Sequence, residues 1–548
     1  MWTVPLLALL ACYDGNDTAS GETGESESGC RSWFIDADGD GAGDPETSQV
    51  TCDPDEGLIE DGGDCDDRRA SVYPGAAELC GDGLVNDCDS DALTASGVCP
   101  MGDGSTLDKA TAWTGQLPAD LAGRALASAG DFNGDGLTDL VVGAYAEFAE
   151  PDDAGAGQGG AAYLVLGSAQ GFSGGSLDNA AARWTGSLSH NAGRAVSPLG
   201  DLNGDGFDDL LVGAFGVAEK GDYSGAAYVL LGSVDPKGHP LSDSIVFLGE
   251  NPQSEAGYAL SGVGDANGDG HPDFVVGAPH EDTTGPDAGT IYLVLGDGGT
   301  PTGGDLEDMD GLLRGEAPDD HLGEWVAPAG DVDGDGIADV AIGAYKESTF
   351  GQWAGAVYVF QGGDGVMQGQ ASDAWKWTGE SVNGRAGVCV DGAGDMDGDG
   401  YGDVVVGANL SGEGGMAYVL RGGGEGLGSG SLANASMRIV GSPNAGLGLA
   451  VSGGGDLDGD GHDDVLLGAP AADNHVGVSL VVLGAEQLPG TTLMDEGWLV
   501  DAGALGGHQG EAVYFGDVTN DGLADVFVGA PTAQDQAGQA YLLVGGGY

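Results

Sequence analysis

The stretch GDLNGDGFDDLLVGA, residues 200–214, decides the fold, because units of this form return along most of the chain. Each unit opens with a nine-residue loop rich in Asp and Gly, followed by a short apolar run that ends in Gly-Ala. The seven loops begin at residues 131, 201, 265, 331, 395, 456 and 517, with spacings of 61 to 70 residues. A repeat of this length suits one four-stranded propeller blade, which buries its faces against neighbouring blades.

The second unit illustrates the expected strands. Short apolar runs bounded by Gly predict strands at 193–199, 209–213, 225–232 and 244–249, with the acidic loop joining the first two. The same pattern in every unit predicts an all-β, seven-bladed β-propeller over residues 105–548.

The seven expected fourth strands begin before the first acidic loop and end before the last one. They contain or end near Trp113, Trp184, Phe247, Leu313, Trp377, Ile439 and Leu499. The first of these precedes the first loop, and no comparable run follows 540–545. We therefore expect the strand near 111–115 to complete the seventh blade and close the ring.

The loops have the composition of calcium sites. Side-chain oxygens at positions 1, 3, 5 and 9, with a backbone carbonyl at position 7, offer oxygen-only coordination. An EF-hand would need Glu at position 12, where a strand residue such as Val142 stands instead. The expected ligands are Asp131, Asn133, Asp135, Leu137 and Asp139; Asp201, Asn203, Asp205, Phe207 and Asp209; Asp265, Asn267, Asp269, His271 and Asp273; Asp331, Asp333, Asp335, Ile337 and Asp339; Asp395, Asp397, Asp399, Tyr401 and Asp403; Asp456, Asp458, Asp460, His462 and Asp464; and Asp517, Thr519, Asp521, Leu523 and Asp525. We expect up to seven Ca²⁺ ions, with the seventh loop the weakest because Thr519 and Asn520 depart from the pattern.

These loops, the VVGA-type runs and the GAAYVL-type third strands resemble the FG-GAP repeat of integrin alpha subunits. The resemblance covers about 105–548 and implies a seven-bladed β-propeller with calcium bound in hairpin loops. It says less about the partner, because related propellers occur in varied proteins.

The chain start suggests export. Residues 1–12 contain an apolar run too short to span a bilayer, and Leu-Leu-Ala-Cys before residue 13 resembles a bacterial lipobox with Cys12 as the lipidated residue. An ordinary secretion signal or a misplaced start remains the alternative. Residues 13–29 are rich in Gly, Ser, Thr and Glu, which predicts a disordered acidic tether.

Residues 30–100 hold six of the eight cysteines, which indicates a disulfide framework; a zinc site is the competitor, although neither a CxxC pair nor a histidine is present. Asp36, Asp38, Asp40 and Asp44 alternate with small residues, as hard-cation ligands do. With GDCDD and NDCD they resemble a metal-binding module of bacterial surface proteins. Some relatives are linked to copper, but calcium fits these ligands better. A disulfide-stapled spacer is the alternative. We expect the isolated Cys389 to be a buried thiol.

The charge balance excludes several partners. The chain has 15 Lys+Arg against 89 Asp+Glu, a formal net charge of −74. It therefore lacks the cationic footprint of a nucleic-acid binder and the basic patches that bind anionic membranes. Contact with a membrane is expected only through the lipid on Cys12.

Three functions remain open. The first is a cell-surface or secreted binding module for protein or glycan, whose variable loops carry Phe148, Phe215, Tyr223, Phe350 and Trp353. The second is an extracellular lyase or hydrolase using His190, His321 or His508, although no nucleophile motif accompanies them. The third is a structural spacer. We expect a binding module without catalytic activity.

Overall fold

The computed structural model describes residues 31–35, 49–51, 58–59, 110–147, 159–363, 365, 367–494, 497–501 and 507–545. The chain forms two compact units, residues 1–77 with 85–94 and residues 78–84 with 95–548. The first unit contains an antiparallel sheet of order β2-β1-β3, built from β1 (Arg31–Ile35), β2 (Gln49–Thr51) and β3 (Leu58–Ile59). Within the described residues, none of the helices has the length and apolar character needed to cross a membrane.

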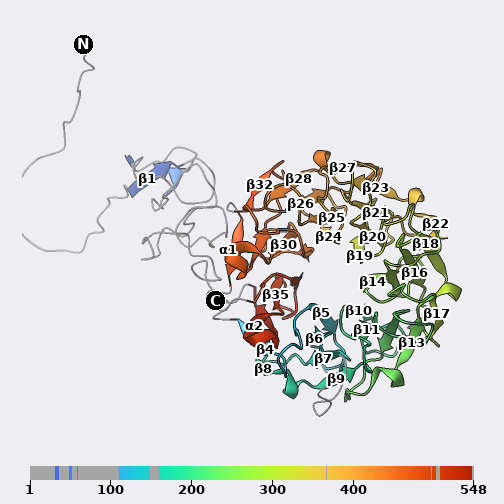
Figure 1. Cartoon of the computed structure of the whole chain (residues 1–548). Coiled ribbons are helices and arrows are strands. Elements are labelled where there is room, and N and C mark those ends of the chain that lie inside the picture. The colour runs from blue at the N-terminus through green and yellow to red at the C-terminus, as the bar shows by residue number, and fades with distance from the viewer. Residues whose placement is uncertain are drawn as a thin grey trace, which may run out of the picture. The chain divides into compact units, whose positions relative to one another are not determined.

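The second unit is a ring of seven blades, which confirms the predicted propeller (Figure 1). The first blade has β5 (Ala125–Gly130), β6 (Asp139–Ala144), β7 (Ala161–Val165) and β9 (Ala182–Thr185), and the second has β10 (Val196–Gly200), β11 (Asp209–Gly213), β12 (Ala226–Leu230) and β13 (Ile245–Leu248). The third has β14 (Ala259–Gly264), β15 (Asp273–Ala278), β16 (Thr290–Val294) and β18 (Gly311–Arg314), and the fourth has β19 (Trp325–Gly330), β20 (Asp339–Ala344), β21 (Ala356–Phe360) and β23 (Trp375–Thr378). The fifth has β24 (Cys389–Gly394), β25 (Asp403–Ala408), β26 (Met416–Leu420) and β28 (Met437–Val440), and the sixth has β29 (Val451–Gly455), β30 (Asp464–Ala469), β31 (Val478–Val482) and β33 (Trp498–Asp501). The seventh has β34 (Ala512–Gly516), β35 (Asp525–Ala530), β36 (Gln539–Leu543) and β4 (Thr111–Thr114).

The ring closes as predicted. β4 pairs antiparallel with β36 in a register that sets Trp113 opposite Ala540. In Figure 1 the strand β4 lies beside the last blade, next to α2 (Ala533–Gln536). Trp113 is 3% exposed and packs edge-on against Phe527 of β35, with ring centroids 6.0 Å apart. An N-terminal strand therefore fills the outer position of the last blade and leaves no open edge there.

The apolar cores lie between blades. The second strand of each blade is buried along its whole length, because both faces of its sheet are covered by neighbouring sheets. The core between the third and fourth blades, for example, joins Val275 and Ile291 to Val340 and Ile342. This explains why each unit carries a continuous apolar run rather than strict alternation.

A fifth strand, which the sequence did not predict, extends five of the blades. The short strands β8 (Gly175–Ser176), β17 (Gly304–Asp305), β22 (Gln368–Gln370), β27 (Gly430–Ser431) and β32 (Thr492–Leu493) each pair in parallel with the fourth strand of the preceding blade. Each comes from the connection between the third and fourth strands of the next unit. The hydrogen bonds therefore tie neighbouring blades together at the rim.

The ring has two chemically distinct faces. Neighbouring strands within a blade are antiparallel, so the acidic loops that join first and second strands all emerge on one face, which we call the acidic face. The connections between second and third strands, and those between one blade and the next, emerge on the opposite face, which we call the loop face. The one-turn helices α1 (Ala472–His475) and α2 belong to connections on the loop face.

Candidate metal and ligand sites

Each acidic loop is curled by its own hydrogen bonds. In the fourth loop, Asp331 accepts the backbone N–H groups of Asp335 at 3.0 Å and Gly336 at 2.9 Å. Asp335 in turn accepts the N–H of Ile337 at 2.9 Å. The bonds from position 6 to position 1 and from position 7 to position 5 recur in all seven loops. Gly334 and Gly336, at φ 76° and 88°, permit the left-handed backbone that this curl requires.

The ninth residue of each loop is a buried carboxylate with a second role. Asp339 accepts the N–H of Val332 in its own loop at 2.9 Å and that of Gly362, beyond the third strand, at 2.8 Å. The contact beyond the third strand is present in every blade. Burial raises the pKa of these carboxyls, to about 6 in Asp339 and to about 8 in Asp464. The aspartate at position 9 therefore connects the loop to its sheet through hydrogen bonds, and it also faces the other aspartates of the loop.

The predicted ligands converge most clearly in the fourth, fifth and sixth loops. Carboxylate oxygens lie within 4.8 Å of one another in three sets: Asp331, Asp333 and Asp339; Asp395, Asp397 and Asp399; and Asp456, Asp458 and Asp460. In the first three loops the amides of Asn133, Asn203 and Asn267 donate to the position-5 aspartates at 2.9–3.1 Å. The backbone N–H of the position-7 residue is fixed by position 5 in every loop, and its carbonyl stays an expected ligand. These oxygen clusters suit a hard divalent cation, which would relieve the repulsion among the carboxylates.

The aspartates of the fifth loop pair with an arginine from outside the loop, a contact that the sequence pattern did not reveal. Arg421, which follows β26, forms an ion pair with Asp397 and a second one with Asp399 at 3.1 Å. The guanidinium therefore competes with a metal ion for two expected ligands. The signal was hidden because Arg421 lies outside the nine-residue motif and reaches the loop only in the folded blade.

The seventh loop keeps the shared curl despite its substitutions. Asn520 adopts φ 57° where the other loops have Gly, a conformation that Asn tolerates better than most residues. The hydroxyl of Thr519 is buried without a hydrogen-bond partner, and its backbone N–H donates to Asp525 at 3.0 Å. Position 3 therefore offers only a neutral oxygen, consistent with the expectation of a weaker site.

The remaining sequence predictions divide into two groups. Cys12, the six clustered cysteines, and Asp36, Asp38, Asp40 and Asp44 lie outside the described residues. Cys389 is a free, fully buried thiol, as expected, and burial raises the pKa of its sulfhydryl.

A cavity of about 510 Å³ runs between the inner strands of the ring. At the loop face it is lined by Arg124, Arg194, Tyr258 and Trp325, and deeper in by Asp391. The guanidinium of Arg194 lies 4.3 Å from the centroid of Tyr258, while Arg124 pairs with Glu511 at 3.4 Å. Arginine and aromatic side chains of this kind are enriched where proteins recognise ligands.

Aromatic residues extend from this cavity mouth across the loop face. Phe215 stacks on Tyr223 with ring centroids 6.4 Å apart and meets Tyr258 edge-on at 5.5 Å. Tyr223 is 41% exposed, and Phe350 and Trp353 are 52% and 37% exposed. Phe148 lies outside the described residues.

The three candidate catalytic histidines lie in the loops that enter the second, fourth and seventh blades. His190 precedes β10, His321 precedes β19 and His508 precedes β34. Hydrogen bonds and ring contacts among the described residues join none of the three to another. His321 contacts Lys346, 2.8 Å from its Nε2, and His508 lies 3.8 Å from Glu511.

Comparison with known families agrees with this geometry. The family model described as "FG-GAP repeat" matches residues 122–165, 192–230, 256–294, 322–360, 447–482 and 509–543. These matches fall on six of the seven blades. They omit the fifth, in which Arg421 pairs with two aspartates of the acidic loop. The model described as "Putative metal-binding motif" matches residues 64–92.

Several integrin alpha subunits are similar to the propeller. Integrin alpha-5 of Xenopus laevis is 31% identical over 220 residues, which is 38% of this chain and 19% of that protein. Integrin alpha-PS2 of Drosophila melanogaster is 32% identical over 154 residues, 27% of this chain and 11% of that protein. Integrin alpha-7 of Homo sapiens is 31% identical over 197 residues, 35% and 15% of the two chains. The matched region spans less than a fifth of each of these relatives.

Proposed function

We propose that this chain, which carries FG-GAP repeats and is similar to integrin alpha subunits, is an exported, calcium-stabilised module that binds protein or glycan. The calcium ions occupy the acidic face, and the ligand binds at the loop face over the central cavity. The observation that carries the proposal is the contrast between one ligand pattern repeated in every acidic loop and the arginine and aromatic residues gathered at the cavity mouth.

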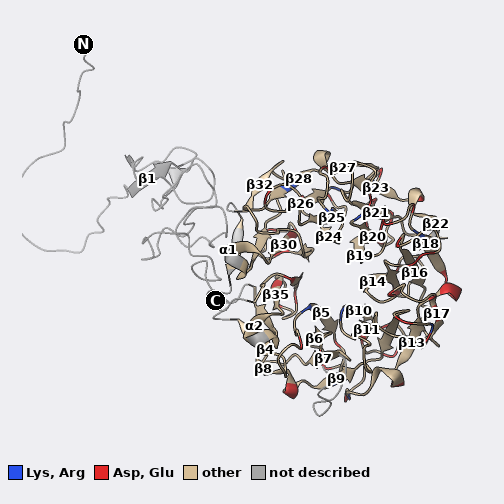
Figure 2. Cartoon of the chain, viewed as in Figure 1, with Lys and Arg blue, Asp and Glu red and all other residues tan. Residues whose placement is uncertain are grey.

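The distribution of cations supports the loop face as the binding surface. Asp and Glu occur all around the ring, whereas Lys and Arg are few (Figure 2). Most of these cations pair with carboxylates, and several of these pairs lie in the loop-face connections: Arg183 with Glu147, Arg314 with Glu250, Lys376 with Glu316, and Arg438 with Glu380. On the same face, Arg194 lies over Tyr258, and Arg385 lies 5.5 Å from the centroid of Tyr345. Neither of these two has a carboxylate within ion-pair distance among the described residues, so their guanidinium groups can donate to a ligand.

Calcium is the cation proposed for the acidic face. The loops offer carboxylate, amide and carbonyl oxygens, which calcium prefers, and the glycines allow the backbone to wrap the ion. The raised pKa values of the ninth-position carboxyls arise from burial and from neighbouring aspartates. A bound cation offsets both effects, so metal binding and folding should be coupled.

The module is proposed to be non-catalytic. The candidate histidines lie in different blades, and among the described residues no hydrogen bond joins a serine or cysteine side chain to any of their imidazoles. Saturable turnover on a panel of polysaccharides would overturn this part of the proposal and favour the lyase or hydrolase alternative.

A binding screen tests the proposal. The full chain should be screened against a glycan array and surface-protein extracts, with calcium and with a chelator. We expect calcium-dependent binding that Arg194→Ala reduces about tenfold or more. Lys237→Ala is the matched control, because Lys237 pairs only with Asp235 at 2.5 Å on an exposed connection between third and fourth strands. Binding that is absent in calcium, or equally reduced by both variants, contradicts the proposal and favours a structural spacer.

A further inference from the structure

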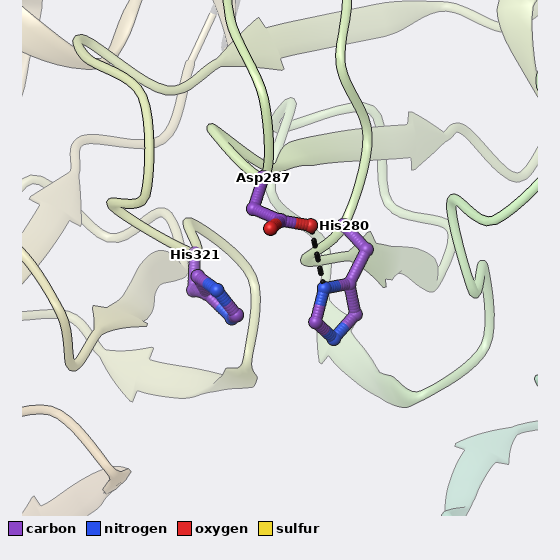
Figure 3. Close-up of side chains that lie close together, drawn as sticks. All are labelled: His280, Asp287 and His321. Carbon is purple, nitrogen blue, oxygen red and sulfur yellow. Dashed lines mark hydrogen bonds and ion pairs between the residues drawn. The ribbon is translucent and has the colours of Figure 1, made fainter.

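Two imidazoles and a carboxylate meet on the loop face where the third blade adjoins the fourth (Figure 3). His280 and Asp287 belong to the connection between β15 and β16, and His321 belongs to the connection between β18 and β19. Their ligand atoms all lie within 4.8 Å of one another. The other such groups among the described residues consist of aspartates in the acidic loops, so this is a site of different chemistry.

The backbone holds these residues in place. The N–H of His321 donates to the carbonyl of Asp287 at 3.1 Å, and the N–H of Asp287 donates to the side chain of Asp282 at 2.8 Å. His321 and Asp287 both have positive φ, 54° and 51°. Asp and His adopt this conformation more readily than most residues, and the backbone hydrogen bonds of both hold it here, so the two ligands are pre-positioned.

Other blade junctions use the same backbone arrangement with different side chains. Glu255 donates its N–H to the carbonyl of Tyr223 at 2.9 Å, and Arg385 donates to that of Trp353 at 3.1 Å. All four of these residues also have positive φ. This backbone arrangement is therefore a property of the repeat. Among the described junctions, one carries an Asp and a His at these two positions, with His280 close to both.

The side chains around the cluster favour a cation. The side chain of His321 is 2% exposed, and its buried Nδ1 atom has no hydrogen-bond partner among the described residues, which is unfavourable for a buried polar atom. Glu324 Oε2 lies 3.7 Å from that Nδ1, and Glu255 Oε2 lies 3.7 Å from His280 Nε2. Three carboxylates thus surround two imidazoles and one ammonium group, that of Lys346, and a metal ion would supply the missing partner and offset the remaining negative charge.

We propose that His280, Asp287 and His321 bind a zinc-type transition-metal ion, with Glu255 or Glu324 as the fourth ligand. Imidazole nitrogens combined with a carboxylate suit zinc and its neighbours, whereas calcium prefers oxygen ligands. The ion would link the third blade to the entrance of the fourth, on the face opposite the acidic loops. This site is additional to the proposed calcium loops and does not depend on them.

Lys346 is an internal competitor of this ion. Its Nζ lies 2.8 Å from Nε2 of His321, and as a donor it favours the tautomer whose proton is on Nδ1. That tautomer cannot coordinate a metal through Nδ1, and the ammonium also repels a cation. Removing the ammonium should therefore tighten metal binding.

Zinc binding to the full chain, measured by equilibrium dialysis in saturating calcium, tests the proposal. Wild type should bind one more zinc equivalent than His280→Ala or His321→Ala. Asp287→Asn, a milder change at a partly exposed residue, should weaken this site about tenfold or more, and Lys346→Gln should tighten it about tenfold. Metal bound elsewhere in the chain cancels in these differences.

His475 and His508 provide the matched control, since their rings also face each other across a blade junction, with centroids 5.8 Å apart. No third ligand converges with them among the described residues, so His475→Ala and His508→Ala should leave zinc binding unchanged. Equal zinc binding by wild type and His280→Ala would overturn the proposal. If His321→Ala melts far below wild type in calcium, the comparison of wild type with Asp287→Asn decides.

Discussion

The two faces of the propeller differ in how much of their chemistry is repeated. On the acidic face, seven loops share one set of backbone hydrogen bonds and nearly one set of oxygen ligands. On the loop face, the same backbone scaffold carries Tyr223 with Glu255 at one junction, Asp287 with His321 at the next, and Trp353 with Arg385 at the one after. Repeated chemistry is what a ring needs for uniform stability, and varied chemistry is what a surface needs for selective contacts. The faces should therefore respond differently to perturbation.

Removing calcium should have the largest effect and should act through the acidic face. A ligand that binds only the native state adds about 2.7 kcal/mol per site at a free concentration a hundredfold above its Kd. Seven such sites in a ring of this size correspond to a rise in Tm of roughly 20 °C. Thermal melts in chelator and in increasing calcium measure this shift. Magnesium at equal ionic strength is the control, and a Tm that does not respond to millimolar calcium contradicts the assignment.

The acidic loops should not contribute equally to the stability that calcium adds. Asp331→Ala in the fourth loop should lower stability in calcium by about 2–4 kcal/mol, because it removes a ligand and three backbone hydrogen bonds. Asp395→Ala removes a ligand and two backbone hydrogen bonds from the fifth loop, where Arg421 already occupies two expected ligands. The second variant should therefore lose less in calcium.

The chelated proteins are the control for this pair of variants, because subtracting each variant's loss in chelator from its loss in calcium removes the contribution of the backbone hydrogen bonds. Arg421→Gln should then tighten calcium binding by the fifth loop, measured by calorimetric titration. An equal calcium-dependent part of the loss in the two variants, or no change on removing Arg421, would show that the guanidinium does not compete with the ion.

The acidic face was largely predictable from the sequence, because its structure follows from local signals. Asp and Gly at fixed positions determine the curl of the loop, and the Val-rich runs determine the buried strands. Ring closure by residues 111–114 could also be predicted, because one fourth strand precedes the first loop and none follows the third strand of the last unit. The parallel strands such as β8 were missed, since two-residue strands have no periodicity to detect.

The loop face was much less predictable. His321 was recognised only as an isolated histidine, and its convergence with His280 and Asp287 depends on packing between two blades. Arg421 was missed for a different reason: its partners belong to the same blade but lie about 20 residues earlier in the chain, outside the span of the loop motif. Contacts between units depend on the relative placement of the blades, which no motif within one unit encodes.

Asp391, which lines the central cavity, should have a smaller effect on stability, and this effect should depend on pH. Burial raises the pKa of Asp391, on β24, to about 7, from about 4 in an unfolded chain. The folded state therefore favours the protonated form, and this residue's contribution to stability is lost as pH rises from about 4 to 7. Asp391→Asn should stabilise the protein at pH 8, by on the order of 1 kcal/mol, and have little effect near pH 4. Melts of both proteins in saturating calcium measure the difference, and an effect that does not vary with pH would locate its cause elsewhere.

The smallest effect on stability is expected from the exposed aromatic residues of the loop face. Phe350 is 52% exposed, so Phe350→Ser should change the free energy of unfolding by less than about 0.5 kcal/mol. Phe247→Ser is the matched buried control, since Phe247 is 2% exposed and packs edge-on against Phe274 at 5.3 Å; it should cost several kcal/mol or prevent folding. If the loop face is a recognition surface, Phe350→Ser should nevertheless reduce binding of any ligand found in the screen, while calcium binding stays unchanged. A variant that loses stability but keeps full binding would assign Phe350 to loop packing and would restrict recognition to the cavity mouth around Arg194 and Tyr258.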